Sequence, residues 1–435
     1  MFSRTQPLLR ELEQAIPDRP FNVRLWDGST LPASDGGGPT FEVRSPDALA
    51  HVLLSPGQLG LGRAYVSGAL AVDDLDTVLE LLESWKPPKL ERREQARLAL
   101  AAARAFGLRR PPAVPKAELR LSGRRHTPER DARAVRHHYD VSNEFFALFL
   151  DESMTYSCAI FSRGATTLEE AQEEKLELVC TKLDLKEGQR VLDIGCGWGS
   201  FAIHAAERHG ASVVGVTLSE PQAALARRRV AERGLADRIE IRVQDYRAIG
   251  DGPFDAVASI GMVEHVGSSQ IDVYARQVAQ LVKPGGRVLN HGIARLRMGD
   301  PEAGAFTQRY IFPDGAPLHL SRIQLALERA GLETHHVEGF RDDYAETLRH
   351  WARRFDDRLD EATRLGGPER VRVWRLYLRG ARRGFETGFT SVYQVRCSRP
   401  IGARRSAAPT PPSSRQGSDG AAPRHSPAQP VRPSG

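Results

Sequence analysis

Short apolar runs alternate with longer amphipathic stretches between residues 190 and 290. The runs typical of buried strands cover 191–194, 211–219, 239–245, 254–260 and 287–289. The intervening stretches 221–233 and 271–281 have the apolar spacing of helices. Strands and helices that alternate in this way predict an α/β fold with a doubly wound parallel sheet. In such folds ligands bind at the carboxyl ends of the strands, where polar residues cluster in this chain.

The first 85 residues have a different pattern, which predicts a small α+β accessory domain. Residues 21–26 and 41–44 alternate between apolar and polar positions, as half-buried strands do. Asp27-Gly28, directly after the first of these runs, is a hairpin turn signal. The remaining segments expected in this domain are 48–54, 59–65 and 74–85.

Positive charge is concentrated in residues 86–136, where 15 Lys or Arg residues stand against 5 Asp or Glu residues. This segment has a net charge of +10 although the whole chain has only +6, and Leu98 and Leu100 alternate there with Arg97 and Arg104. The pattern predicts a basic, partly amphipathic helix that suits an anionic membrane surface. A solvated linker helix is the alternative. Aromatic residues are few in this segment and no nucleic-acid motif accompanies it, so we expect no nucleic-acid partner.

Residues 401–435 combine seven prolines with almost no large apolar side chain. Such a segment cannot bury a core, and we expect it to be disordered. The sequence therefore predicts four parts, which are an accessory domain over 1–85, a basic helical linker over 86–136, an α/β domain over 137–400 and a disordered tail over 401–435.

Several classes of protein are disfavoured by composition. No apolar run approaches the roughly 20 residues needed to span a bilayer, and the first 17 residues lack a signal-like apolar block. The four cysteines show no paired metal spacing and suit a reducing cytoplasm. His137-His138 are adjacent and would point apart on a helix. We therefore expect a cytoplasmic protein with no metal site.

A glycine-rich turn follows the first strand of the predicted sheet. The residues after Val191-Leu192 follow the order D-x-G-x-G-x-G, with Asp193 before Gly195, Gly197 and Gly199. Glycine lets the backbone pass close under a ligand where a Cβ would collide. The motif differs from the dinucleotide fingerprint and lacks the lysine of a P-loop. It resembles the first motif of the S-adenosylmethionine-dependent methyltransferases.

Further motifs make a resemblance to one family of these enzymes specific. His137–Phe146 and Asp151–Ala159 precede the glycine turn, and Gly215–Ser219, Glu264–Gly267 and Phe312–Gly315 follow it. Together these motifs resemble the cyclopropane-fatty-acyl-phospholipid synthases, a family that includes the mycolic acid cyclopropane synthases. The resemblance covers about residues 15–400.

The resemblance implies an S-adenosylmethionine site at the carboxyl ends of the strands. Tyr156 and Ser157 would close over the methionine end of the cofactor, Thr217 stands where an acid usually holds the ribose, and Gln244 and Asp245 would meet the adenine. The full set of cofactor residues expected from the family is Tyr156, Ser157, Asp193, Gly195, Gly197, Thr217, Leu218, Ser219, Gln222, Gln244 and Asp245.

The resemblance also implies how the reaction ends. Methylation of an isolated alkene leaves a carbocation, and one base must remove a proton from the new methyl group so that the ring closes. In this family the base is understood to be a bound bicarbonate. Its ligands would be Cys158, Glu264, His291, the backbone of Ile293, and Tyr344. Glu264 would orient the ion and accept its proton, and His291 and Tyr344 would donate hydrogen bonds.

Each side chain of this set also has an ordinary structural interpretation. Cys158 could be a small core residue, and Glu264 could cap a helix after a strand. His291 could be a satisfied interior histidine. Tyr344 is expected in a loop before a helix, where its support is the family pattern Tyr-Ala-Glu-Thr-Leu-x-x-Trp.

The resemblance leaves the product open. Cyclopropane formation on unsaturated phospholipid acyl chains is the first hypothesis, and methylene- or methyl-branched acyl chains are an alternative on the same substrate. A small-molecule methyltransferase and a non-catalytic lipid-binding protein are further alternatives. For the lipid enzyme we expect a peripheral location on the inner face of the membrane, and a homodimer is left open.

Overall fold

The computed structural model describes residues 5–107, 110–120, 127, 130, 131, 133, 142–300 and 304–402. The expected disordered tail lies outside these residues beyond 402, and so do His137-His138. Residues 1–401 form one compact unit. None of the helices in the described ranges is both long enough and apolar enough to cross a membrane.

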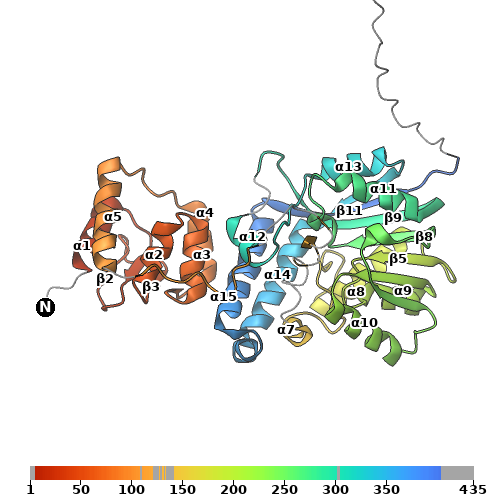
Figure 1. Cartoon of the computed structure of the whole chain (residues 1–435), viewed down its shortest axis with the longest axis horizontal. Helices are drawn as coiled ribbons and strands as arrows, with labels where there is room; N and C mark the ends of the chain where they lie inside the picture. The colour runs from red at the N-terminus through yellow and green to blue at the C-terminus, as the bar shows by residue number, and fades with distance from the viewer. Residues whose placement is uncertain are drawn as a thin grey trace, which may run out of the picture. The chain divides into compact units, whose positions relative to one another are not determined.

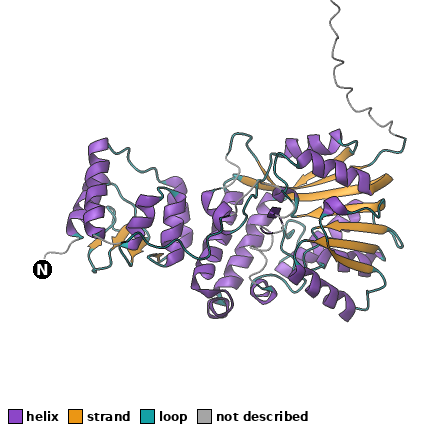
Figure 2. Ribbon diagram, viewed as in Figure 1, coloured by secondary structure: helices purple, strands orange, loops and turns teal. Residues whose placement is uncertain are grey.

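The main sheet confirms the predicted α/β architecture (Figures 1 and 2). It has the strand order β10-β11-β9-β8-β5-β6-β7, in which β5, β6, β7, β8 and β9 are parallel. The bounds of its strands are β5 (Arg190–Ile194), β6 (Ser212–Thr217), β7 (Ile239–Val243), β8 (Phe254–Ile260), β9 (Val282–Arg295), β10 (Glu333–Gly339) and β11 (Thr390–Ser398).

The sheet differs from the expected one on the side of β9. This strand extends to Arg295, well beyond the short run 287–289, because β11 pairs with it from Arg287 to Arg295. β11 runs antiparallel to both of its neighbours, so the sheet is mixed at this edge. Neither β10 nor β11 has the continuous apolar run of a buried parallel strand, and neither was predicted.

Helices cover both faces of the sheet, as Figure 1 shows. Neighbouring residues of β5 point to opposite cores: Val191 packs in the cluster with α8, α9 and α10, and Leu192 in the cluster with α11 and α13. Burial on both faces explains why the strand is a continuous apolar run. The bounds are α8 (Leu168–Leu183), α9 (Ser200–His209), α10 (Glu220–Glu232), α11 (Ile271–Leu281) and α13 (Leu320–Arg329), with α12 (Ala305–Tyr310) and the 3₁₀ turns η1 (Tyr246–Ala248) and η2 (Val263–His265) between them.

A helical layer beside the sheet is built from α7 (Asn143–Ala147), α14 (Arg341–Asp356) and α15 (Leu359–Glu386). Non-helical backbone at Gly367, with φ of 75°, interrupts α15 just before Pro368. Aromatic side chains dominate the core of this layer: Phe145, Phe146, Phe149, Trp351, Phe355 and Trp374 are all buried. Tyr344 lies in the first turns of α14 and not in the expected loop.

The N-terminal region is the expected small α+β unit. Its sheet has the order β2-β1-β3-β4, and the antiparallel pairing of β1 with β2 confirms the turn at Asp27-Gly28. The bounds are α1 (Gln6–Ala15), β1 (Asn22–Arg24), β2 (Thr30–Leu31), β3 (Thr40–Val43), α2 (Asp47–Leu54), α3 (Gln58–Ser67), β4 (Leu70–Val72), α4 (Leu75–Ser84) and α5 (Arg92–Phe106).

The basic helix predicted in the linker is α5, but its apolar side packs against the rest of the N-terminal region. Ala101, Ala102 and Ala105 are buried in the core of the N-terminal region, and Leu98 packs against it. The helix is therefore part of that unit, in contrast to the linker expected from 86 onwards. Its exposed side carries Arg92, Arg93, Arg97 and Arg104.

The other end of the expected linker belongs to the α/β part. Arg130 makes a buried ion pair with Asp314, and Asp131 accepts a hydrogen bond from Arg247 at 3.0 Å. Residues 130 and 131, which the sequence assigned to the linker, thus contact the α/β part.

Candidate active site

A pocket opens at the carboxyl ends of β5, β6, β7 and β8, as expected for a doubly wound fold. All of the predicted cofactor residues except Ser219 line it. Ser219 is buried and starts α10, where its hydroxyl accepts a hydrogen bond from the backbone N–H of Gln222 at 3.4 Å. The predicted residues that line the pocket are Tyr156, Ser157, Asp193, Gly195, Gly197, Thr217, Leu218, Gln222, Gln244 and Asp245.

The glycine turn has the backbone that its sequence predicts. Gly195, Gly197 and Gly199 have φ values of 80°, 54° and 82°, in the left-handed region that favours glycine. A Cβ at Gly197 would meet no atom within 4 Å, so a side chain there would project into open space. The turn therefore leaves room for a ligand directly beside its backbone.

A buried lysine that sequence reasoning missed lies on the wall of the pocket. Lys175 of α8 donates a hydrogen bond to the Ser157 hydroxyl at 3.0 Å, and both residues line the pocket. Burial lowers the pKa of Lys175 to about 8. The sequence does contain a signal, because Lys175 occupies the apolar side of its helix, between Ala171 and Val179.

Asp193 is the second buried ionisable group on this wall. Burial raises its pKa to about 7, and Lys175 acts in the opposite direction. Its Oδ2 atom is buried and has no hydrogen-bond partner within the described ranges of the chain. A buried polar atom without a partner is costly, so this oxygen is suited to accept a hydrogen bond from a ligand.

The acid after β7 is held by a cation. Asp245 accepts a hydrogen bond from Arg247 Nε at 2.8 Å, and Arg247 also binds Asp131 at 3.0 Å. Gln244 donates through its amide nitrogen to the carbonyl of Ala248 at 2.9 Å. Asp131 lines the pocket as well, although the sequence assigned it to the linker.

Glu264 and His291 place two buried polar atoms near the end of β8, on the turn η2 and on strand β9 respectively. Glu264 lies inside the 3₁₀ turn η2, so it does not cap a helix. His291 pairs in register with Ile260, a residue of the pocket wall. Glu264 Oε2 and His291 Nε2 both lack a hydrogen-bond partner among the residues that the structure describes.

Burial sets the protonation of both groups. It raises the pKa of Glu264 to about 7, although the backbone amide of Ile293 faces the carboxylate and acts in the opposite direction. It lowers the pKa of His291 to about 3, so this imidazole is neutral near neutral pH. The amide of Ile293 is thus directed at Glu264, where the sequence had assigned it to a bound ion.

A hydrogen-bond relay fixes which nitrogen of His291 carries the proton. Lys182 donates to Gln394 Oε1 at 2.6 Å and can only donate, so the amide nitrogen of Gln394 faces His291. This nitrogen lies 3.0 Å from His291 Nδ1, which must accept. The proton of the neutral ring is therefore on Nε2, the atom without a partner. Sequence reasoning missed Lys182 and Gln394, which lie on α8 and β11.

Phe340 joins the other two predicted residues to this group. Its carbonyl accepts from the backbone N–H of Tyr344 at 3.1 Å and from the Cys158 thiol at 3.6 Å. Its ring is parallel to that of His291, with the centroids 6.4 Å apart. Burial raises the pKa of Cys158 well above its usual value, so the sulfur stays a thiol. None of the five predicted residues lines the pocket itself. Ile293 and Tyr344 pack against the core cluster that contains Cys158 and Phe340.

The fold and the site define an S-adenosylmethionine-dependent methyltransferase, and the comparisons with known proteins show the family. The family model described as mycolic acid cyclopropane synthetase matches residues 126–395. The chain belongs to this family and is an enzyme of its class.

Three relatives illustrate the similarity. A probable fatty acid methyltransferase of Pseudomonas putida is 36% identical over 416 residues, covering 92% of this chain and 96% of that protein. The cyclopropane-fatty-acyl-phospholipid synthase of Escherichia coli K12 is 34% identical over 372 residues, covering 85% and 90%. A crystal structure of the mycolic acid cyclopropane synthase CmaA1 with SAH and CTAB matches with a TM-score of 0.59 and 32% identity, covering 61% and 98%.

The glycine turn generates a prediction about the cofactor. Replacing Gly197 by Val should lower affinity for S-adenosylmethionine at least about tenfold, or about 1.4 kcal/mol, because the side chain enters the space beside the turn. Calorimetric titration measures the affinity. Gly234→Val is the matched control, since Gly234 also has a left-handed φ (67°) and open space around its Cβ, and it does not line the pocket. Equal affinity of the two variants would show that the cofactor lies elsewhere.

The raised pKa of Glu264 predicts a pH dependence of stability. A carboxyl group with a pKa of about 7 in the folded state and 4.5 ordinarily binds its proton more tightly when folded. The contribution of Glu264 to the free energy of unfolding is therefore fully present below pH 4.5. This contribution, roughly 3 kcal/mol in total, is lost as the pH rises through 7. Glu264→Gln cannot ionise and should not lose this contribution.

Urea unfolding of both proteins between pH 4.5 and 8 measures the effect. The stability of the wild type relative to Glu264→Gln should fall across this range, and the effect of Asp193 cancels in the comparison. Glu232→Gln, at an exposed position of α10, is the control and should track the wild type. Parallel curves for the wild type and Glu264→Gln would contradict the assigned pKa.

Proposed function

We propose that this enzyme transfers a methylene unit from S-adenosylmethionine to the double bond of unsaturated acyl chains of phospholipids, forming a cyclopropane ring. The observation that carries the proposal is the pair of buried atoms without a partner, Glu264 Oε2 and His291 Nε2, beside the pocket. A methyltransferase that acts on an amine or a hydroxyl has no need for a buried pair of polar atoms of this kind. An alkene substrate does, because its cation must lose a proton inside the protein.

The pocket residues fit the cofactor. Open space beside Gly197 accommodates it, and the free oxygen of Asp193 can accept a hydrogen bond from it. When bound, S-adenosylmethionine supplies an electrophilic methyl group. Tyr156 lines the pocket with its ring stacked on Trp351 at 5.1 Å between centroids. Aromatic faces attract cations, so this pair suits a site in which a positive charge is transferred.

The residues Cys158, Glu264, His291, Ile293 and Tyr344, here called the cradle, fit a small anion that can carry a proton. We propose that this anion is bicarbonate. When bound, bicarbonate supplies the base for the last proton. His291 offers Nε2–H as a donor, with its tautomer fixed by Gln394 and Lys182. Glu264 accepts a proton readily at neutral pH, since its pKa of about 7 matches the operating range. Tyr344 and the Cys158 thiol complete the set around Phe340.

A second product is favoured by one comparison. The Pseudomonas putida relative, named as a probable fatty acid methyltransferase, matches more of this chain than the Escherichia coli cyclopropane synthase does. A methylene- or methyl-branched acyl chain is therefore the alternative product. The methylene-branched chain needs the same cofactor, substrate and cation as the ring, and the two differ in which proton is removed. A saturated methyl branch needs in addition a hydride donor that reduces the methylene product.

Lipid mass spectrometry tests the proposal. Purified enzyme with S-adenosylmethionine and vesicles of monounsaturated phosphatidylglycerol should yield acyl chains that gain one CH₂ and no longer react with ozone. A product that still reacts with ozone would establish the methylene alternative. A methyl-branched product, which gains two further hydrogens, would need a hydride donor added to the assay. No mass gain on any acyl chain would refute the lipid substrate.

The same assay tests the base. Carbonate-free buffer should slow the wild type, and added bicarbonate should restore the rate. Glu264→Gln should lose at least about 100-fold in rate, the scale of a lost general base, with little change in cofactor affinity. An unchanged rate in carbonate-free buffer would mean that a side chain and not bicarbonate removes the proton.

Substrate chains lie in a bilayer, so the proposed enzyme must dock on the surface of that bilayer. We place this docking at the inner face of the cytoplasmic membrane. Because Leu98, Ala101, Ala102 and Ala105 pack in the core of the N-terminal region, the large apolar surface that α5 still exposes is that of Leu100 alone. This helix therefore has little apolar surface to insert. Its exposed arginines can still attract an anionic surface, each by about 1 kcal/mol. Docking through α5 is therefore electrostatic.

Vesicle sedimentation measures this docking. The chain should pellet with phosphatidylglycerol vesicles and be released by about 0.5 M salt, because screening shortens the range of the attraction. Replacing Arg92, Arg93, Arg97 and Arg104 by Gln should reduce pelleting and leave cofactor affinity unchanged.

The control removes the same charge elsewhere, with Gln at the exposed Arg208, Arg228, Arg276 and Arg329 on α9, α10, α11 and α13. It should pellet much like the wild type. If both variants lose binding equally, only net charge matters. If neither does, the docking surface lies outside α5.

A further inference from the structure

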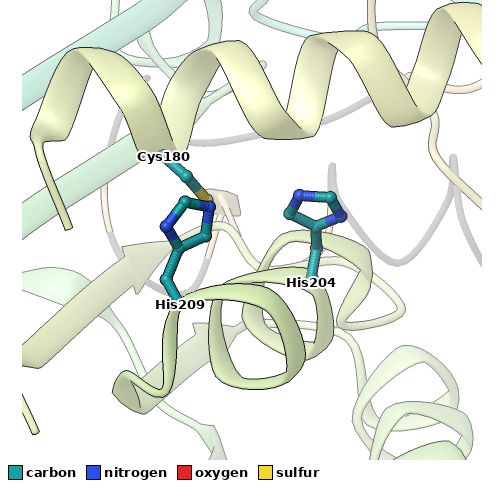
Figure 3. A group of neighbouring side chains, drawn as sticks. All are labelled: Cys180, His204 and His209. Atoms are coloured by element: carbon teal, nitrogen blue, oxygen red, sulfur yellow. The ribbon is translucent and has the colours of Figure 1, made fainter. Parts of the chain in front are cut away.

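A second group of chemically active side chains lies between α8 and α9. Cys180 comes from α8, and His204 and His209 come from α9, with their side chains in the space between the two helices (Figure 3). The sulfur and a ring nitrogen of each histidine all lie within 4.8 Å of one another. Cys180 and His204 are buried, and His209 is partly exposed.

A carboxylate adds a fourth donor atom to this group. Glu177 precedes Cys180 by three residues and therefore lies on the same side of α8. Its Oε2 atom is 3.1 Å from the Nε2 atom of His204 and 3.1 Å from that of His209. Ligand atoms about 2.0–2.1 Å from a tetrahedral metal are roughly 3.3 Å apart. Oε2 of Glu177 therefore already lies, from each of the two imidazoles, at the spacing of two ligands of one ion.

We propose that Glu177, Cys180, His204 and His209 form a structural site for a divalent transition metal of the zinc type. One sulfur, two imidazole nitrogens and one carboxylate oxygen make a donor set that zinc binds in proteins. Four protein ligands leave no open position for a substrate, which distinguishes a structural site from a catalytic one. The proposal is independent of the function proposed for the pocket.

The surroundings of the group favour an ion. Thr181 donates through its hydroxyl to Glu177 Oε1 at 3.3 Å, which orients the carboxylate from behind. The Glu177 side chain is 45% exposed and gives an ion a path from solvent.

The position of the site indicates what the ion would do. Ser200, at the start of α9, lines the pocket, and His209 ends the helix roughly 13 Å further along its axis. α8 carries Lys175, whose ammonium group lies on the pocket wall. A metal between α8 and α9 would hold these two helices together. It would thereby fix α8, which carries Lys175, against α9, which starts at the glycine turn.

The same distances also describe an arrangement without a metal, in which Glu177 accepts hydrogen bonds from both histidines. The two arrangements are separated by the thiol, because only the metal site requires the sulfur of Cys180. Cobalt reports on this directly, since a tetrahedral Co²⁺ with a thiolate ligand shows a near-ultraviolet charge-transfer band together with visible bands.

The experiment uses the untagged full chain after treatment with a chelator. Titration with Co²⁺ should give one equivalent of the tetrahedral spectrum with the thiolate band, and Zn²⁺ should displace it and raise the Tm. Cys180→Ala should lose the thiolate band, and Cys397→Ala, at a buried cysteine of β11, should keep it. Glu177→Gln, at a partly exposed position, should weaken Zn²⁺ binding by at least about tenfold.

Two results would overturn the proposal. One is a wild type whose cobalt spectrum lacks the thiolate band. The other is equal zinc content and an equal zinc-dependent rise in Tm in the wild type and Glu177→Gln. The spectrum of the wild type alone decides the case if Cys180→Ala does not fold.

Discussion

Burial of ionisable groups at the carboxyl ends of β5, β8 and β9 is the constraint on which the active end of this enzyme depends. The low polarity that raises the pKa values of Asp193 and Glu264 to about 7 also lowers that of His291 to about 3. Carboxyl groups are thereby poised to exchange protons near neutral pH, and the imidazole is kept as a neutral donor. A reaction that produces a carbocation also requires such a dry site, because water would capture the cation. Desolvation therefore sets the protonation states of these groups, and it would also protect the carbocation of the proposed reaction.

The aromatic layer of α7, α14 and α15 maintains this dryness. Its rings pack edge to face around Trp374, with Phe145 and Phe146 at centroid distances of 5.8 and 5.2 Å. Phe340, which directly precedes α14, then ties the cradle to the layer through Cys158, Tyr344 and His291. A relay from Lys182 through Gln394 reaches His291 from the other side. Because the antiparallel strand β11 carries Gln394, the mixed edge of the sheet has a direct role in orienting the cradle.

Much of the sheet and of the cofactor pocket was predictable from local patterns. Continuous apolar runs identified β5, β6 and β8, because strands covered on both faces exclude polar residues. The edge strand β7 was identified by its alternating pattern, which matches its alternately buried and exposed positions. The glycine turn was predictable because only glycine tolerates its positive φ angles. Tyr344 was assigned to a loop, since the pattern of α14 is polar in its first turn, where Asp342 and Asp343 precede it. β10 and β11 were missed because their polar positions are stabilised by pairing with distant strands, a property that no local window contains.

By itself, the sequence determined the fold class, the family and most of the expected cofactor residues that line the pocket, because periodicity, left-handed glycines and ordered motifs are local properties of the chain. Tertiary structure decided which of these residues act together. Lys175, Asp131 and Gln394 reach the site from elements far apart in sequence. The apolar side of α5 is buried in its own domain, although its pattern suited a membrane surface. Cys180 and His204 showed no metal spacing, and only the packing of α8 on α9 brings them together. Distances between such residues depend on how helices and strands pack, and the order of residues along the chain does not record them.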